Sequence, residues 1–168
     1  MSYTLWLIPE EEKVKTYLSQ IINELANKYN GPTLEPHATL LGDLPLSLEE
    51  VTKGCENFVA KTKPFTVEIN IVEYSTTYYQ CIFARLKPPP ELMSLYDLAK
   101  QSMELTNQSI FMPHLSLFYG NISYQQRQEI MDTLQFVPQK FTVSSIVIVP
   151  GGENLPLDWK HLAEYKFL

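Results

Sequence analysis

Hydrophobic and polar residues recur along the N-terminal part of the chain with the periods of short strands and one long helix. The apolar and aromatic run from Tyr3 to Ile8 predicts a first strand, which Pro9 closes. A helix is expected next, because apolar residues fall on one helical face at Val14, Leu18, Ile21, Ile22, Leu25 and Tyr29. The tripeptide Asn30-Gly31-Pro32 predicts the end of this helix. A second strand is expected from His37 to Leu41, stopping at Gly42-Asp43.

The next segment predicts a second helix followed by a β-hairpin. Ser47 and Glu50 have the spacing of a capping box, and apolar residues between Leu48 and Val59 share one helical face. From Phe65 to Tyr74, apolar residues alternate with polar ones, as in a half-buried strand. The β-rich run from Gln80 to Leu86 then predicts the antiparallel partner of that strand.

The second half of the chain repeats this order of elements. After three consecutive prolines at 88–90, the apolar spacing predicts a third helix over Leu92 to Met103, and Ser123 with Gln126 forms a capping box for a fourth. Three further strands are expected at Pro113–Tyr119, at Phe141–Val149 and, as an edge or closing strand, at His161–Phe167. The repetition predicts two similar lobes whose corresponding strands lie side by side.

Composition agrees with a folded chain of ordinary domain size. The 168 residues are 45% hydrophobic and 12% aromatic but only 19% charged, so the chain can bury enough apolar surface to offset its ordering entropy. No segment of low complexity separates the two halves. We therefore expect one α+β domain over residues 1–168, with two pseudo-symmetric lobes. Each lobe would have an antiparallel sheet flanked by helices, and a cleft would lie between the lobes.

Charge and cysteine content narrow the choice of partners. The net charge of −6 argues against binding along a long nucleic acid, but it permits a small anionic ligand in a local pocket. No apolar run approaches the roughly 18 residues that a membrane span needs. Cys55 and Cys81 lack CxxC spacing, which favours a reducing compartment and argues against thiolate metal ligands. We expect a cytoplasmic monomer that needs no membrane.

Two short segments carry the candidate chemistry. Pro36-His37-Ala38-Thr39-Leu40 and Pro113-His114-Leu115-Ser116-Leu117 share the pattern Pro-His-apolar-hydroxyl-Leu. Side chains alternate across a strand, so each segment presents an imidazole and a hydroxyl on the same face. These are two of only three histidines in the chain. Since proline fills about 5% of positions, two histidines would both follow proline by chance about once in 400 such pairs.

Two imidazoles that converge on one cleft suit phosphodiester hydrolysis. One neutral histidine can take a proton from the attacking water while a protonated histidine gives one to the leaving alkoxide. Thr39 and Ser116 can donate hydrogen bonds to the phosphate oxygens, where charge builds in the transition state. This chemistry needs neither a metal ion nor a cofactor. The simplest alternative places His37 and His114 in the core, satisfied by backbone groups.

The paired H-x-[ST] strands in a bilobal chain of this size resemble the 2H phosphoesterase superfamily, and within it the cyclic phosphodiesterases. The resemblance implies hydrolysis of a 2′,3′-cyclic nucleotide or of ADP-ribose 1″,2″-cyclic phosphate to a monophosphate, with His37 and His114 as acid and base. It also implies that Trp6 and Tyr119 face the ligand with Thr39 and Ser116. Plant-type members have disulfides that Cys55 and Cys81 cannot fully reproduce.

Two other functions remain open from the sequence. One is RNA-end processing by a related 2H enzyme of the 2′-5′ RNA ligase type, which would need a longer basic path from the cleft than this chain offers. The other is a catalytically silent module that binds nucleotides or phosphorylated partners. Binding alone does not require two titratable imidazoles, so the hydrolase is the preferred interpretation. Nucleobase preference, the division of roles between the histidines and the position of the product phosphate stay undetermined.

The other conspicuous residues favour ordinary roles. His161 lacks a framing motif and is expected to be a surface histidine. Arg85 and Lys87 are expected at a solvated strand end, and Gly151-Gly152 is expected to form a turn that lines the cleft. A cluster of tyrosines is expected to decorate the hairpin rather than to stack a base: Tyr74, Tyr78 and Tyr79.

Overall fold

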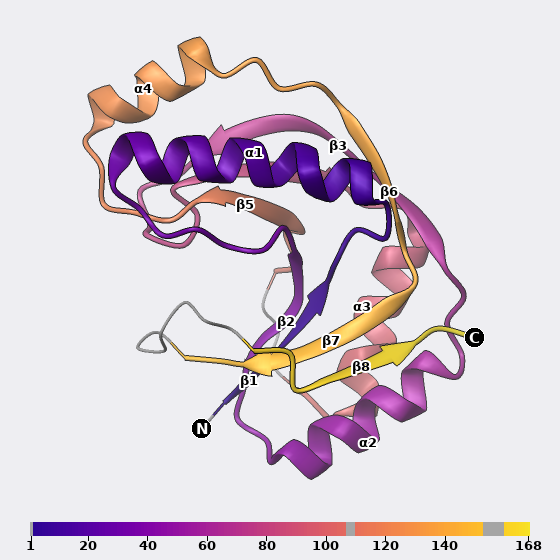
Figure 1. Cartoon of the computed structure of the whole chain (residues 1–168). Coiled ribbons are helices and arrows are strands. Elements are labelled where there is room, and N and C mark those ends of the chain that lie inside the picture. The colour runs from indigo at the N-terminus through magenta and orange to yellow at the C-terminus, as the bar shows by residue number, and fades with distance from the viewer. Residues whose placement is uncertain (1, 107–109, 153–159) are drawn as a thin grey trace.

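A computed structural model describes residues 2–106, 110–152 and 160–168. Its strands form one eight-stranded antiparallel sheet in the order β6-β3-β4-β5-β2-β1-β7-β8 (Figure 1). The strands are β1 (Tyr3–Leu7), β2 (Ala38–Leu44), β3 (Phe65–Tyr74), β4 (Ile82–Lys87), β5 (His114–Phe118), β6 (Gln139–Val143), β7 (Ser145–Pro150) and β8 (Ala163–Lys166). The helices are α1 (Glu12–Tyr29), α2 (Leu48–Val59), α3 (Pro90–Ser102) and α4 (Tyr124–Thr133).

The sheet confirms the expected two-lobed α+β architecture. The upper lobe in Figure 1 contains β6, β3, β4 and β5, and the lower lobe contains β2, β1, β7 and β8. The two halves have the same internal order, so β5 corresponds to β2 and β4 corresponds to β1. They join where Ala38 of β2 pairs with Leu115 of β5. The two histidine segments are therefore neighbours at the centre of the sheet.

The helices interlock the two lobes. Helix α1 follows β1 of the lower lobe but packs on β5 and β6 of the upper lobe. Helix α3 follows β4 of the upper lobe and packs on α2 and β2 of the lower lobe as well as on β3. Both expected capping boxes are present, at Ser47 with Glu50 and at Ser123 with Gln126. Across the described ranges, no helix has the length and apolar character needed to cross a membrane.

Two predicted strand boundaries are wrong. The second strand does not stop at Gly42-Asp43 but continues to Leu44, which pairs with Tyr3 across a bulged stretch of β1 and β2. Asp43 adopts a left-handed φ of 48°, which lets the bulged strand continue. The Asp43 carboxylate accepts a hydrogen bond at 2.8 Å from the backbone N–H of Gly152, which follows β7.

The strand expected over Phe141–Val149 is in fact two strands that pair with opposite lobes. Val143 in β6 pairs with Phe65, whereas Ser145 in β7 pairs with Lys166. The residues facing the main core are odd-numbered before Ser144 and even-numbered after it: Phe141, Val143, Ile146 and Ile148. The sequence pattern does not reveal this change of face at Ser144, because β7 has apolar residues on both faces.

Candidate active site

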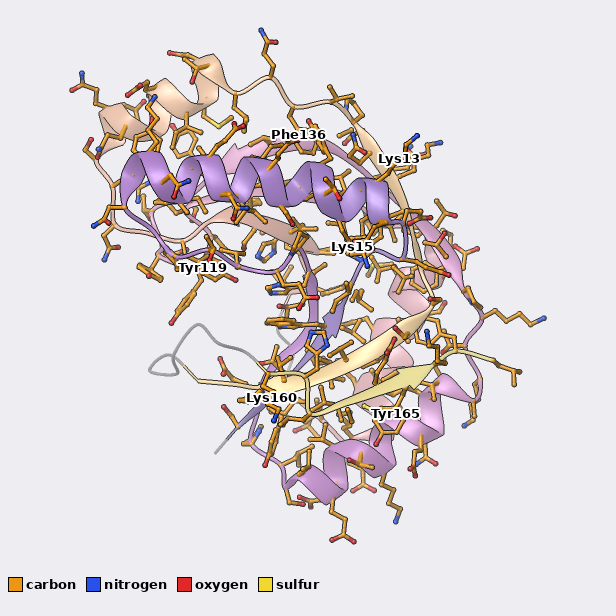
Figure 2. The ribbon with its side chains drawn as sticks, in the orientation of Figure 1. Lys13, Lys15, Tyr119, Phe136, Lys160 and Tyr165 are labelled. Carbon is orange, nitrogen blue, oxygen red and sulfur yellow. The ribbon has the colours of Figure 1, made fainter. Side chains whose placement is uncertain are left out.

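The two lobes enclose a cleft of about 330 Å³ at the junction of β2 and β5. All six residues singled out from the sequence line it: Trp6, His37, Thr39, His114, Ser116 and Tyr119. The remaining lining residues are Thr4, Gly42, Asp43, Tyr79, Gln80, Pro150, Gly151 and Gly152. The expected turn at Gly151-Gly152 is therefore a wall of the cleft. In Figure 2, Tyr119 lies on the upper lobe and Lys160 on the lower lobe, on either side of the space between them.

Each catalytic candidate is held by the same backbone geometry. The Nδ1 atom of His37 is 2.7 Å from the carbonyl oxygen of Glu35, and the Nδ1 atom of His114 is 2.9 Å from that of Met112. A carbonyl oxygen only accepts, so Nδ1 of each ring is the donor. In the neutral ring, the lone pair is then on Nε2. Both imidazoles therefore present Nε2 as the atom that can take up or release a proton.

The register of the central strands sets the two motifs against each other. Ala38 of β2 pairs with Leu115 of β5, and continuing this antiparallel register by one residue in each direction would place His37, just before β2, across from Ser116 and Thr39 across from His114. Diagonal neighbours in a regular sheet are roughly 7–8 Å apart, which leaves room for one phosphate between two imidazoles. Each histidine therefore has a hydroxyl from its own strand and one from the other lobe nearby.

Burial makes the two imidazoles electrostatically unequal. His37 is only 4% exposed, and loss of solvent lowers its pKa to about 4, with a smaller contribution from the charge of His114. His114 is half-buried; partial burial also lowers its pKa, and the Arg85 guanidinium opposite it on β4 acts in the same direction. His37 is therefore harder to protonate than His114 and is neutral at physiological pH.

The hydroxyl on β5 is already part of a hydrogen-bond network. Ser116 Oγ donates to the carbonyl of Tyr79 at 3.0 Å. Burial raises the pKa of Tyr119 to about 12, and a hydrogen bond with the Ser116 side chain partly opposes that rise. Tyr119 thus carries its phenolic proton at neutral pH. For Ser116 to donate to a bound phosphate, its hydroxyl must turn away from the Tyr79 carbonyl.

Aromatic rings support both imidazoles. Trp6 stacks on His37, with ring centroids 3.6 Å apart and an interplanar angle of 12°. At the corresponding place on β4, Phe83 contacts His114 edge-on at 5.3 Å. Phe83 was not predicted from the sequence, although it pairs with Ser116 as Trp6 pairs with Thr39. The correspondence of the two lobes is the signal that could have identified it.

The tyrosines of the hairpin tip do not form one cluster. Tyr78 and Tyr79 pack with Tyr119, with centroid distances of 6.2 and 5.2 Å, and Tyr79 lines the cleft. Tyr74 instead accepts a hydrogen bond from Gln128 and packs edge-on against Tyr124. The cluster at the cleft mouth thus comprises Tyr78, Tyr79 and Tyr119.

The lower rim of the cleft contains an acidic residue that the sequence analysis missed. The backbone N–H of Asp43 donates to Thr4 Oγ1 at 3.3 Å, and its carboxylate accepts the Gly152 N–H. A side chain at Gly151 would meet Thr4 Oγ1 at 3.0 Å and Asp43 Oδ1 at 3.1 Å. This explains the glycine at that position. Among the described residues, no group of three or more His, Cys, Asp or Glu side chains is placed to hold a metal ion.

The curled antiparallel sheet, with a histidine and a hydroxyl from each central strand facing one cleft, defines a 2H phosphoesterase. The chain belongs to the cyclic phosphodiesterase-like protein family, whose model matches residues 1–157. The protein is therefore a phosphodiesterase.

Two similar proteins agree with this assignment. The chain is 26% identical to a cyclic phosphodiesterase of Arabidopsis thaliana, over 77% of this chain and 71% of the relative. It is 25% identical to a 2′,3′-cyclic-nucleotide 3′-phosphodiesterase of Yarrowia lipolytica, over 77% of this chain and 62% of that protein.

Two solved structures share the fold at low identity. The protein TT0787 of Thermus thermophilus superposes with a TM-score of 0.72 at 16% identity, covering 99% of this chain and 98% of that one. E. coli LigT complexed with 3′-AMP superposes with a TM-score of 0.61 at 13% identity, covering 99% and 97%. At these identities, the likeness concerns the fold alone.

Proposed function

We propose that this protein hydrolyses a 2′,3′-cyclic nucleotide, or ADP-ribose 1″,2″-cyclic phosphate, to a monophosphate without a metal ion. The observation that carries the proposal is the matched pair of imidazoles in one cleft, each with Nδ1 bonded to the carbonyl two residues upstream. This arrangement suits the transfer of protons at two Nε2 atoms on either side of a phosphate. The named relatives from Arabidopsis and Yarrowia support a cyclic phosphate as substrate.

The two histidines take different roles in this mechanism. His37, with a pKa of about 4, is the neutral base that accepts a proton from water as the water oxygen bonds to phosphorus. His114 donates its Nε2 proton to the ring oxygen as the P–O bond breaks. The proton gained by His37 and the proton lost by His114 are exchanged with solvent before the next turnover. A bound anionic phosphate favours the protonated form of His114.

The other four predicted site residues bind the substrate or support the histidines. Thr39 and Ser116 donate to the phosphate oxygens, where negative charge increases in the transition state. Trp6 keeps the ring of His37 in plane through the stacking contact. Tyr119 closes the cleft beside Ser116 and supplies an O–H group that stays protonated at neutral pH.

Phosphorus NMR of a panel of cyclic phosphates, recorded with a chelator present, tests this function. The panel contains the four 2′,3′-cyclic mononucleotides, ADP-ribose 1″,2″-cyclic phosphate and an oligonucleotide with the same cyclic end. We expect a monophosphate product from at least one small substrate, and a loss of about 100-fold or more in either His37→Ala or His114→Ala. Unchanged rates in both variants, or binding without product across the panel, would refute the proposal.

A second measurement separates the acid from the base. An aryl phosphodiester with p-nitrophenolate as leaving group needs little protonation of the departing oxygen. On that substrate, His114→Ala should lose much less activity than His37→Ala. Equal losses would contradict the division of roles.

A further inference from the structure

The third histidine of the chain lies beside the cleft, in contact with residues that support or line the site. His161, which precedes β8, has Nε2 at 2.7 Å from a carboxylate oxygen of Glu35. Its ring also meets Trp6 edge-on, with centroids 6.5 Å apart and an interplanar angle of 87°. The interpretation of His161 as an ordinary surface histidine is therefore incomplete: its side chain is 43% exposed, but both of its contacts lead to His37.

Glu35 connects the two histidines through different atoms. Its backbone carbonyl accepts the Nδ1 proton of His37, and its carboxylate contacts His161. Trp6 also connects these two histidines, because it stacks on His37 and meets His161 edge-on. Four residues from three separate chain segments thus form a closed ring of contacts: Trp6, Glu35, His37 and His161.

The pseudo-symmetry of the fold supplies an internal comparison. In the upper lobe, the carbonyl of Met112 holds Nδ1 of His114 as the Glu35 carbonyl holds that of His37. A thioether has no charge to pair with an imidazole. The carbonyl contact is therefore common to both motifs, and the carboxylate-imidazole pair is an addition on the His37 side alone.

We propose that Glu35 and His161 form a positioning pair that orients His37 and sets the pH range in which it acts as base. The inference rests on the proposed function, because it assigns the base role to His37. Anchoring the Glu35 side chain restrains the carbonyl that fixes the tautomer of His37. His161 makes no contact with the reacting atoms in this scheme, and its effect passes through Glu35 and Trp6.

The charges around His37 give the pair its second effect. Two titratable side chains lower the pKa of His37, namely His114 from β5 and His161 from the segment before β8, while the backbone carbonyl of Glu35 raises it; β1 places the uncharged rings of Trp6 against the imidazole. A protonated His161 disfavours a second positive charge on His37, and so it lowers the pKa of His37. Removing His161 should therefore make His37 easier to protonate.

Three variants test the positioning pair. His161→Ala removes both the contact and the charge, His161→Gln keeps a donor for Glu35 without a charge, and Lys160→Ala is the exposed control beside them. kcat and KM are measured on a hydrolysed cyclic phosphate from pH 4 to 8. We expect His161→Ala to lower kcat roughly tenfold with KM within about twofold, because a misplaced base acts on the chemical step.

The pH profile distinguishes positioning from simple loss of structure. In both His161 variants, the acidic limb of kcat/KM should move to higher pH by about 0.5 unit or more, and His161→Gln should keep kcat within about threefold of the unaltered protein. If the limb stays in place in both variants, or if His161→Ala matches Lys160→Ala, the proposal is overturned.

Nitrogen NMR of the imidazoles in the ligand-free protein keeps this test independent of turnover. The unaltered protein should show His37 protonated on Nδ1, and His161→Gln should show the titration of His37 at higher pH. If no cyclic phosphate is hydrolysed, the proposed function fails while this titration still decides the structural pair. If hydrolysis occurs but His37 titrates identically in all variants, the positioning pair fails alone.

Discussion

The burial of His37 predicts a pH-dependent loss of stability that has a definite size. The ring is only 4% exposed, and its pKa is held at about 4, against 6.5 in an exposed chain. Between these values the unfolded chain binds a proton that the folded protein rejects. The free energy of unfolding should therefore fall as the pH drops below about 6.5, and the loss should be complete near pH 4.

The magnitude follows from the two pKa values. Their difference is about 2.5 pH units, and each unit corresponds to about 1.36 kcal/mol, so the full loss is roughly 3 kcal/mol. About 2 kcal/mol of that loss falls between pH 7.5 and pH 5. Hydrogen bonds lower the pKa values of carboxylates such as Glu11 and Glu50. The contributions of these carboxylates to the free energy of unfolding are therefore lost mainly below pH 5.

Urea unfolding of the unaltered protein and of His37→Gln, at steps from pH 7.5 to 5, measures the effect. The carboxylate contributions are common to both proteins and cancel in the difference. We expect the difference in unfolding free energy to change by about 2 kcal/mol over this range, and by less when His114→Gln replaces His37→Gln. Parallel curves for the unaltered protein and His37→Gln, or a His37 imidazole that titrates near pH 6.5 in NMR, would refute the reasoning.

Three further predictions concern the cleft and its support. Because burial and Arg85 lower the pKa of His114, the alkaline limb of kcat/KM should lie below pH 6.5. The alkaline limb of kcat should lie at higher pH, because bound phosphate favours the imidazolium, and a pH-rate series on one cyclic phosphate checks both limbs. Ser116→Ala should lower kcat about 10–100-fold with a smaller change in KM, since its hydrogen bond strengthens in the transition state, and steady-state kinetics against Ser116→Thr provide the control. Gly31→Ala should destabilise the protein by roughly 1–3 kcal/mol in chemical denaturation, because a Cβ there would lie 2.2 Å from the Phe118 ring, whereas Gly42→Ala, whose Cβ would lie 3.6 Å from Thr39, should cost less.

Local signals in the sequence were sufficient for most elements and for the identity of the site. Helix caps, hydrophobic periods and proline positions depend on residues a few places apart, so the capping boxes at Ser47 and Ser123 were predictable. The duplicated motif indicated that His37 and His114 converge. The neighbouring strands β2 and β5 bring both histidines to one cleft.

Contacts between distant segments were beyond the reach of those signals. The break at Ser144 between β6 and β7 arises because these strands pair with opposite lobes. The apolar run through β7 does not indicate which lobe it pairs with. The bulge that extends β2 past Asp43 likewise requires the partner strand β1. Local periodicity cannot resolve either feature, because both depend on pairing across the sheet.

The sequence by itself determined the two-lobed class, the paired imidazoles and the hydroxyls beside them, since strand alternation alone places a residue and its second neighbour on one face. Only the tertiary structure decided how unequal the imidazoles are and what surrounds them. Three contacts join segments far apart in the chain: Trp6 stacks on the buried His37, Arg85 of β4 pairs with His114 of β5, and His161 contacts Glu35. Solvent exclusion and charge proximity arise from packing in three dimensions, and these two quantities set the proton affinities on which the chemistry depends.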